Sequence, residues 1–334
     1  MEEKLKTIII ILAAGNATRL RPLSERIPKP LIKINGKTII SRIITSFTNS
    51  GFNRFIVLVG YKSELVKKEV LRKKGIQVDF VEQTERTGMA DGILLCINYI
   101  NEYHKEINNY FVTAADIIFS KKEILKMYGL IQNRKANIIL SLMRSQDKRI
   151  GKGHANVKLT MDGFKITDII EKPSVEQILS EFYSLPLYIF NNKISYYLEN
   201  IEVSERGEKE FQDAIKEAIN NKEFPLGINI IDELISIENI GAYHLTYLKD
   251  IIGMNLRFLD RSQTNTNLII GEGSEIGINC YLVDTVLFEN VRLGDNVNLE
   301  NCIVDKGIIL KKGYKAKDCF LTYDKKGNLN KIEF

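Results

Sequence analysis

The residues best suited to chemistry lie close to the N-terminus. An apolar run delivers the chain into the small-residue loop Leu12–Gly15, and Arg19 and Lys29 follow it. Small residues let a ligand approach the backbone closely, and successive backbone N–H groups in such a loop bind anions. Pro28 and Pro30 stiffen the segment that carries Lys29. Two cations beside such a loop predict phosphoryl chemistry, which needs positive groups where negative charge develops.

Two common phosphate-binding patterns are absent from this region. The loop matches neither GxxxxGK[ST], which marks a P-loop, nor the dinucleotide fingerprint GxGxxG. A strand–turn–helix whose charges are merely solvated is the alternative to a phosphate site. The element Pro28-Lys29-Pro30 at this distance from the loop favours the phosphate site.

The elements that position these residues follow from apolar periodicity. Strands alternate with helices, which requires crossover connections and therefore an α/β fold with a doubly wound, mostly parallel sheet. Beyond about residue 135 the pattern predicts an antiparallel hairpin over 158–170 and a helix over 208–221. The earlier predicted strands are Ile8–Leu12, Phe55–Gly60, Gln77–Val81, Phe111–Ala114 and Asn137–Met143, and the helices are Ser41–Ser50, Ser63–Lys74, Gly92–Glu102 and Lys122–Gln132.

The C-terminal part has a different periodicity. From Leu268 a small or apolar residue recurs at hexapeptide spacing, with corners such as Ile276-Gly277 and Leu293-Gly294. This pattern is typical of a parallel β-helix, in which roughly 18 residues form one three-sided coil, so that about three coils fit. A β-meander is the alternative, but the repeated corners favour the β-helix. We therefore predict two domains, 1–255 and 256–334.

Composition limits the class of protein. The chain has 334 residues, of which 44% are hydrophobic and 27% charged, which excludes a disordered chain, a collagen and a coiled-coil rod. A net charge of +5 is only mildly basic, so we expect no nucleic-acid partner. The apolar run Ile8–Ala14 is too short for a membrane helix and lacks a convincing cleavage site. We therefore expect no membrane partner. Because no cysteines form a CxxC pair, we expect reduced thiols and a cytoplasmic location.

Ordered motifs along essentially the whole chain resemble those of the sugar-phosphate nucleotidyltransferases, or NDP-sugar pyrophosphorylases. The segment from Leu12 to Leu31 is similar to the family signature LAGGxGTRLxPLT…PKPL. The hexapeptides resemble the left-handed β-helix of the glucose-1-phosphate adenylyltransferase and mannose-1-phosphate guanylyltransferase branches. Further matching motifs are Glu82-Gln83 with Gly88–Asp91, Thr113–Asp116, Glu171–Pro173, Asp213–Ile215 and Glu238–Gly241.

The resemblance implies a Rossmann-like catalytic domain and a specific reaction. A nucleoside triphosphate and a sugar 1-phosphate, most simply glucose 1-phosphate or mannose 1-phosphate, would give an NDP-sugar and pyrophosphate. The sugar phosphate attacks the α-phosphorus in line, so the protein must position and neutralise two polyanions rather than supply a nucleophile. The resemblance also implies Mg²⁺ as cofactor and a homo-oligomer formed through the β-helix.

The resemblance assigns roles to the charged residues. Arg19 is expected to hold the leaving pyrophosphate, Lys29 the α-phosphate and Lys172 the sugar phosphate. Asp116 and Asp213 are expected to hold Mg²⁺, a hard cation that prefers oxygen ligands. The alternatives are a capping role for Asp116, a solvated helix face for Asp213 and a surface turn for Lys172. Asp116 follows a predicted strand, and the carboxyl ends of strands are where α/β sheets place their sites.

The remaining expected site residues would recognise the base, ribose and sugar. Gln83, with the backbone of Gly88, is expected to read the base, Glu171 to accept sugar hydroxyls, and His154 to approach the sugar. The segment Gly88–Asp91 resembles the GTADA motif of adenylyl- and guanylyltransferases slightly more than the GLAQA motif of thymidylyltransferases. The residues expected to approach the base and ribose are Leu12, Ala14 and Gly15.

The sequence departs from the family pattern at several positions. Ala17 replaces a loop glycine; alanine tolerates positive φ poorly, although the clash is modest and this position need not be left-handed. Ala115 replaces the glycine before the first metal ligand. Gln212 replaces the threonine before the second, and we match the glutamate that precedes it with Glu208. Other departures are Ile237, Asn239 and Ala242-Tyr243.

Three other functions fit parts of the pattern. A catalytically weak regulatory subunit of an NDP-sugar pyrophosphorylase is the main alternative, but Arg19, Lys29 and Asp116 are all present. A β-helix that transfers acyl groups would typically use a histidine base, and no histidine follows His244. A non-enzymatic nucleotide-binding module does not need the paired acidic positions. The enzyme is therefore the favoured hypothesis.

Overall fold

The protein is described by a computed structural model that covers residues 4, 6–85, 87–133, 136–259 and 267–334. The chain groups into two compact units. The first unit contains the chain up to Asn16 together with Pro28–Leu31 and Ile40–Ile237, and the second contains Ala17–Ile27, Ile32–Ile39 and Glu238–Phe334. The domain boundary at residue 255 stays a prediction.

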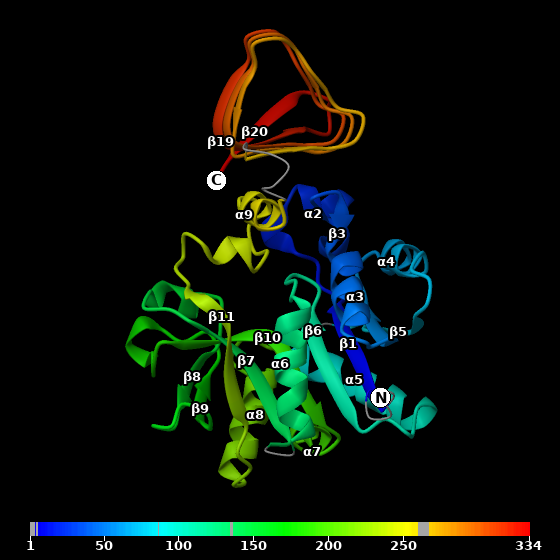
Figure 1. The fold of residues 1–334 in the computed structure, drawn as a ribbon, viewed down its shortest axis with the longest axis vertical. Helices are drawn as coiled ribbons and strands as arrows, with labels where there is room; N and C mark the ends of the chain where they lie inside the picture. The colour runs from blue at the N-terminus through cyan, green and yellow to red at the C-terminus, as the bar shows by residue number, and fades with distance from the viewer. Residues whose placement is uncertain (1–3, 5, 86, 134–135, 260–266) are drawn as a thin grey trace. The chain divides into compact units, whose positions relative to one another are not determined.

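The first unit is built on a mostly parallel sheet (Figure 1). Its main path runs in the order β11-β7-β10-β6-β1-β4-β5 among the described residues, with β10 antiparallel to both of its neighbours. The strands are β1 Thr7–Ala13, β4 Arg54–Val59, β5 Gln77–Glu82, β6 Asn109–Ala114, β7 Ile138–Arg144, β10 Phe182–Asn191 and β11 Leu226–Leu234, with the hairpin of β8 Asn156–Leu159 and β9 Ile166–Ile170 beside β10. The prediction of a doubly wound, mostly parallel sheet is confirmed.

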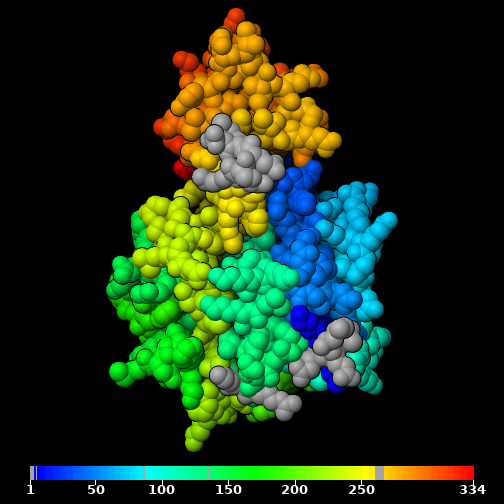
Figure 2. Space-filling view, in the orientation of Figure 1, coloured from blue at the N-terminus to red at the C-terminus, as the bar shows by residue number. Residues whose placement is uncertain are grey.

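Helices cover both faces of this sheet because successive strand residues point to opposite sides. Ile8 and Ile10 of β1 belong to a buried cluster with residues of α5, α7 and α8. On the other face, the ring of Phe111 contacts the rings of Phe47 from α3 and Tyr128 from α6. Figure 2 displays α6 on the surface of the first unit. The helices are α3 Ile39–Asn49, α4 Ser63–Val70, α5 Met89–Tyr103, α6 Lys121–Gln132, α7 Ile194–Glu199 and α8 Phe211–Asn220.

Sequence reasoning misses β10, the strand between β6 and β7. The strand contains Pro186, which lacks a backbone N–H and is normally confined to edges and bulges. The register between β10 and β7 shifts between Leu185 and Tyr188, so the proline lies at an irregularity of the ladder. The predicted helix Ser63–Lys74 is also too long, because α4 ends at Val70.

The second unit contains a parallel β-helix, drawn in Figure 1 as stacked triangular coils. Neighbouring coils are offset by 17 residues, as in the pairs Asn267–Asp284 and Cys302–Cys319, so the expected coil of roughly 18 residues is too long. The predicted β-helix is confirmed, and its left-handedness stays a prediction. Its strands are β12 Leu268–Ile270, β13 Glu275–Ile276, β14 Tyr281–Val283, β15 Thr285–Leu287, β16 Arg292–Leu293, β17 Asn298–Val304, β18 Ile309–Leu310 and β19 Lys315–Tyr323, with β20 Leu329–Glu333 antiparallel to β19.

Left-handed residues form the corners of the coils. Positive φ occurs at equivalent positions of successive coils, and the side from Asn279 to Asp284 is shorter than the side from Gly273 to Asn279. This short side explains why the coil repeat is shorter than three full hexapeptides. Asn, Asp and Gly tolerate this conformation best. The corner sets are Gly273, Asn290 and Gly307; Asn279, Asn296 and Gly313; and Asp284, Asn301 and Asp318.

The other elements of the second unit come from both ends of the chain. They are α2 Leu23–Arg26, the two-stranded hairpin of β2 Lys33–Ile34 and β3 Lys37–Thr38, and α9 Asp250–Arg257. Among the described residues, every helix falls short of the length and apolar character that crossing a bilayer requires. The four cysteines are free thiols, and Cys302 and Cys319 stack in the β-helix with sulfur atoms 3.7 Å apart.

Ala17, whose conformation the sequence left open, is the left-handed residue of the N-terminal loop. Its φ of 49° and ψ of 51° are left-handed, whereas Gly15 is not among the residues with positive φ. The left-handed position of the loop is therefore occupied by an L residue with a side chain.

We expect Ala17→Gly to raise the stability of the protein. A left-handed conformation disfavours an L residue by about 1–2 kcal/mol, and the extra chain entropy of glycine offsets about 0.5–1 kcal/mol of this gain. The net change is about 0.5–1 kcal/mol, read as a higher thermal midpoint by circular dichroism. Ala14→Gly is the matched control, because Ala14 has no positive φ and glycine there should lower the midpoint. Equal midpoint changes in the two variants would contradict the prediction.

Candidate active site

The carboxyl ends of β1 and β6 lie next to each other in the sheet. Both β4 and β6 pair in parallel with β1, so the chain order reverses between β1 and β6. In open α/β sheets, ligands bind at such a switch point. The backbone N–H of Ala115 donates a hydrogen bond to Leu12 O at 3.0 Å. The loop with Ala14 and Gly15 and the turn with Asp116 therefore begin side by side.

A cation and a carboxylate meet at this switch point. Lys29 Nζ lies 2.7 Å from Asp116 Oδ2, and their side chains are only 18% and 20% exposed. A short 3₁₀ turn over Lys29–Leu31 presents the lysine, and β6 ends just before the aspartate. The structure thus brings together two residues that sequence analysis assigned to one site. Arg19 belongs to the second unit, where its guanidinium lies 5.8 Å from the centroid of the Tyr247 ring.

The segment expected to read the base is tied to the segment before α8. Gln83 Nε2 donates to Gly88 O at 3.2 Å. Gly88 has a φ of 116°, and a Cβ there would lie 2.4 Å from Lys209 O. The backbone N–H of Lys209 donates to Thr87 O at 2.7 Å, and that of Ala90 donates to Lys209 O at 3.1 Å. Only glycine fits at this crossing, and Lys209 is a residue that sequence reasoning missed.

A hollow of about 310 Å³ opens beside Gln83. Its lining combines the apolar side chains of Leu94 and Leu95 with polar groups from Thr84, Thr87 and Asn98 and with the carboxylates of Glu82, Glu85 and Asp91. An aromatic heterocycle with polar edges matches such a lining, because ligand sites combine apolar contact area with a few placed polar groups.

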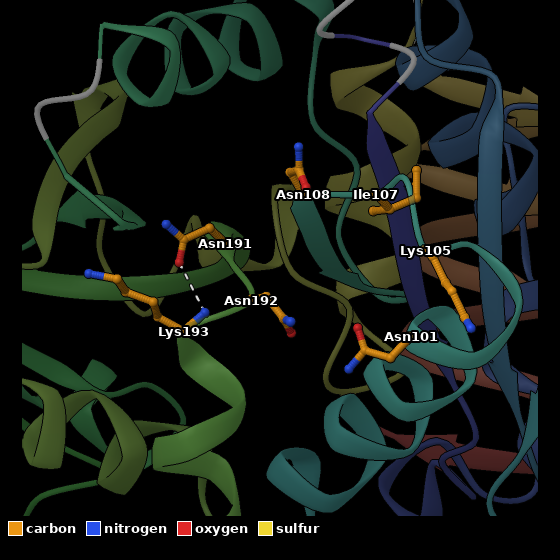
Figure 3. Close-up of a pocket in the computed structure, with 7 residues that line it drawn as sticks. All are labelled: Asn101, Lys105, Ile107, Asn108, Asn191, Asn192 and Lys193. Carbon is orange, nitrogen blue, oxygen red and sulfur yellow. Dashed lines mark hydrogen bonds between the residues drawn. The ribbon is translucent and has the colours of Figure 1, made fainter.

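A second hollow, of about 370 Å³, lies at the other end of the sheet (Figure 3). Asn108 and Lys105 precede β6, whereas Asp116 follows it, so this hollow is remote from the switch point. Asn191, at the end of β10, accepts a hydrogen bond from the backbone N–H of Lys193 at 3.1 Å. None of the expected site residues lines this hollow.

Glu171 and Lys172 form a charged group beyond β9. Lys172 Nζ lies 3.0 Å from Glu171 Oε1, and Arg206 Nη2 lies 3.9 Å from the same oxygen. Burial raises the pKa of Glu171, although the two cations counteract it. Lys172 has a φ of 43°, a conformation that L side chains rarely adopt. Backbone strain of this kind clusters at functional sites.

Glu210 and Glu208 differ in burial, and the match of Glu208 with the family glutamate stays a prediction. Glu208 is exposed, whereas Glu210 is buried and accepts hydrogen bonds from Arg206, with Nη2 at 2.7 Å. Glu210 precedes the first residue of α8, and Asp213 lies in the first turn of that helix. Burial and the neighbouring Glu210 charge raise the pKa of Asp213. The i,i+4 spacing of Arg206 and Glu210 was the available signal, but such pairs are usually surface pairs.

Tyr188 lies among these carboxylates. It is a buried residue of β10, and Gln212 Nε2 is 3.5 Å from its hydroxyl oxygen. Burial raises the pKa of Tyr188, and the charges of Glu171 and Asp116 are close enough to raise it further. Tyr188 therefore lies close to both Asp116 and the charged group around Glu171. Sequence reasoning missed it because β10 was not predicted.

The donor set fits a divalent cation bound by few protein ligands. No group of three or more His, Cys, Asp or Glu side chains that could hold a metal occurs in the part of the chain that the structure describes. Mg²⁺ commonly uses one or two carboxylates and keeps waters and substrate phosphates as its other ligands. Asp116 and Asp213 supply oxygen donors of this kind. Their role as ligands stays a prediction.

His154 is buried, and its Nδ1 lies 3.3 Å from Ile150 O. It follows a 3₁₀ turn, Lys148–Lys152, and precedes β8. Its expected approach to a sugar stays a prediction.

We expect Glu171→Gln to change the pH dependence of stability. Because the folded-state pKa of Glu171 is raised, its proton-linked stability is present below its unfolded pKa and is lost as pH rises through the folded pKa. Glutamine does not titrate, so the thermal midpoint of Glu171→Gln minus that of the wild type should increase between pH 4 and pH 7.5.

Glu176→Gln is the matched control for this pH experiment. Glu176 is exposed, and a hydrogen bond from Ser174 lowers its pKa. Its contribution is present above the unfolded pKa and is lost as pH falls, so the control difference should change in the opposite direction. The same pH slope in both variants would contradict the assignment of a raised pKa to Glu171.

Comparison with known proteins places this site in context. A family model described as nucleotidyl transferase matches residues 8–232. The chain is 30% identical over 255 residues to the bifunctional protein GlmU of Methanococcus maripaludis, covering 75% of this chain and 54% of that protein. It therefore spans about half the length of that curated relative.

Two other related proteins are matched over a larger share of their own length. UTP–glucose-1-phosphate uridylyltransferase AglF of Haloferax volcanii is 28% identical over 209 residues, which is 62% of this chain and 81% of that protein. A solved structure of UDP-glucose pyrophosphorylase with UDP-glucose superposes with a TM-score of 0.57 at 19% identity, covering 67% of this chain and 90% of that one. The structural similarity is one of fold.

Proposed function

Because this chain belongs to the nucleotidyl transferase family, we propose that it joins a nucleoside triphosphate to a sugar 1-phosphate, releasing pyrophosphate. The family membership confirms the resemblance drawn from the motifs. The observation that carries the proposal is the Lys29–Asp116 pair at the switch point of the sheet, 2.7 Å apart. A phosphate site needs the cation and a metal site needs the carboxylate, and the two functions meet where α/β sheets bind ligands.

The reaction needs positioning more than covalent chemistry. A phosphate oxygen of the sugar 1-phosphate attacks the α-phosphorus of the nucleotide, and the bond to the leaving pyrophosphate breaks as the new P–O bond forms. Lys29 is proposed to neutralise the α-phosphate and Arg19 the pyrophosphate. Lys172 is proposed to hold the sugar phosphate while Glu171 accepts sugar hydroxyls. A divalent cation, proposed to be Mg²⁺ held by Asp116 and Asp213, would supply charge neutralisation to the phosphates.

The nucleotide is proposed to bind over the loop after β1. The hollow beside Gln83 is the proposed base site, with the Gly88 backbone at its rim. Leu12, Ala14 and Gly15 are proposed to contact the base and ribose. Apart from its chain neighbours, no atom of the described residues lies within 4 Å of the position that a Cβ would take on Gly15, so this part of the backbone has room for a ligand. UTP is the first nucleotide to test, because AglF is named a uridylyltransferase of glucose 1-phosphate.

The proposed function is tested by pyrophosphate release. Four nucleoside triphosphates are crossed with glucose, mannose, galactose and N-acetylglucosamine 1-phosphates in the presence of Mg²⁺. Release with one nucleotide and glucose or mannose 1-phosphate supports the proposal and names its substrates. Folded protein that is inactive across the grid contradicts it and favours the regulatory-subunit alternative.

We also propose that the chain forms a homo-oligomer through its β-helix and acts in the cytoplasm. The β-helix exposes large apolar side chains, including Ile278 at 70%, Tyr281 at 58% and Ile309 at 56%. Light scattering after size-exclusion chromatography tests the oligomer. A monomeric mass at all concentrations would contradict it.

A further inference from the structure

The segment that carries Lys29 is flanked on both sides by parts of the second unit. Residues Ala17–Ile27 and Ile32–Ile39 group with the C-terminal residues from Glu238 onward, whereas Pro28–Leu31 group with the sheet. The first flank ends in α2, and the second flank forms the β2–β3 hairpin. The position of the Lys29 turn therefore depends on what holds its two flanks.

The first flank is held by a buried carboxylate of the β-helix. The side chain of Asp305 is only 3% exposed, and its Oδ2 accepts a hydrogen bond from Arg26 Nη2. Thr322, which is also buried, donates its hydroxyl to the same Asp305 oxygen at 2.6 Å and lies 3.2 Å from Arg26 Nη2. A buried charge of this kind is strongly unfavourable without its partner, so the pair fixes Arg26 to the β-helix.

The second flank has its own attachments. Lys33 Nζ lies 2.6 Å from Glu289 Oε1, at a corner of the β-helix. The backbone N–H of Asn35 donates to Asn255 Oδ1 at 2.6 Å, and Asn35 Nδ2 donates to Phe258 O at 2.8 Å. Asn255 is buried in α9. Both flanks of the turn are thus bonded to residues of the second unit that lie near the C-terminus of the chain.

We propose that Asp305 and Glu289 are positioning residues for the nucleotide, acting through Arg26 and Lys33 on the turn that carries Lys29. The proposal rests on the proposed function, because it assigns Lys29 to the α-phosphate. A group misplaced by about 1 Å can lower the rate by about 100-fold, so loss of the anchors on the flanks is expected to affect how the nucleotide binds.

The test is the kinetics of Asp305→Asn in the full chain. Asparagine keeps the shape of the side chain and removes the charge that holds Arg26. We expect the KM for the nucleotide to rise about tenfold, with the KM for the sugar 1-phosphate unchanged, because only the nucleotide contacts the Lys29 turn in the proposed site. Asp318→Asn is the matched control, since Asp318 Oδ1 accepts a hydrogen bond from Asn301 Nδ2 within the β-helix.

A double mutant separates positioning from general destabilisation. If Asp305 acts through Lys29, adding Asp305→Asn to Lys29→Gln should raise the nucleotide KM little further, because the two changes remove the same interaction. Equal rises in both KM values, fully additive effects, or an unchanged nucleotide KM in folded Asp305→Asn protein would overturn the proposal. Glu289→Gln, at a more exposed pair, is the second variant if Asp305→Asn fails to fold.

Hydrogen exchange gives a readout independent of activity. In Asp305→Asn, amides of residues 17–39 should exchange faster than in the wild type and in Asp318→Asn. If the wild type releases no pyrophosphate, the proposed function fails, while faster exchange still supports the anchoring of the flanks. Unchanged exchange in this segment would overturn the anchoring itself.

Discussion

Asp116→Asn is expected to lower the kcat for pyrophosphate release by at least about 1000-fold. A metal ligand stabilises transition-state charge by several kcal/mol, and each 1.36 kcal/mol is a tenfold change in rate. Asparagine keeps the size of the side chain but removes the charge that faces Lys29 at 2.7 Å. The measurement is steady-state pyrophosphate release with saturating nucleotide, sugar 1-phosphate and Mg²⁺.

The control for this variant is Asp232→Asn. Asp232 forms an exposed pair with Lys122 at 3.3 Å, so the same change of charge there should leave the kcat within about twofold. Mn²⁺ binding, followed by its paramagnetic resonance signal, should weaken in Asp116→Asn and not in the control. An Asp116→Asn enzyme with wild-type kcat would refute the assignment of this carboxylate to the metal.

Lys29→Gln is expected to lower kcat/KM by about 100- to 1000-fold. This is the size of effect seen when one preorganised donor is removed from a developing negative charge. The lysine is only 18% exposed and lies on a short 3₁₀ turn flanked by prolines, so its ammonium group is held in place beside Asp116. The readout is kcat/KM for the nucleotide at several Mg²⁺ concentrations.

Lys121→Gln is the matched control for this second variant. Lys121 is exposed at the start of α6, and the loss of its charge should leave kcat/KM nearly unchanged. Lys29→Arg should recover part of the loss, because the positive charge remains while the donor geometry differs. If Lys29→Gln and Lys29→Arg are equally impaired, shape rather than charge governs this position.

Some of the charged residues of the candidate site could be predicted from sequence motifs, and others could not. The resemblance to the family motifs assigns Asp116 and Lys29 to one site, and the structure pairs them. The grouping of Glu171 with Lys172 also follows from adjacency in the sequence. Glu210 is buried and Glu208 is exposed, a difference between two nearby glutamates that neither a motif nor a helical pattern predicts.

Tyr188 and Asp305 could not have been assigned from the sequence. Tyr188 reaches the carboxylates because β10 runs antiparallel between β6 and β7, and Pro186 obscured that strand. Asp305 reaches Arg26 across 279 positions of the chain. Contacts of this separation depend on how the coils stack and where the chain crosses between units, which no local pattern records.

The sequence by itself determined the alternation of strands and helices, the hexapeptide coils and the family of the chain. Apolar periodicity sets which face of an element is buried, and short motifs mark where a backbone must approach a ligand. The tertiary structure decided which charges meet, how burial shifts the pKa values of Glu171 and Asp213, and that Ala17 is left-handed. These properties depend on distances and dielectric surroundings between residues remote in the chain, and such distances exist only once the sheet and coils have packed.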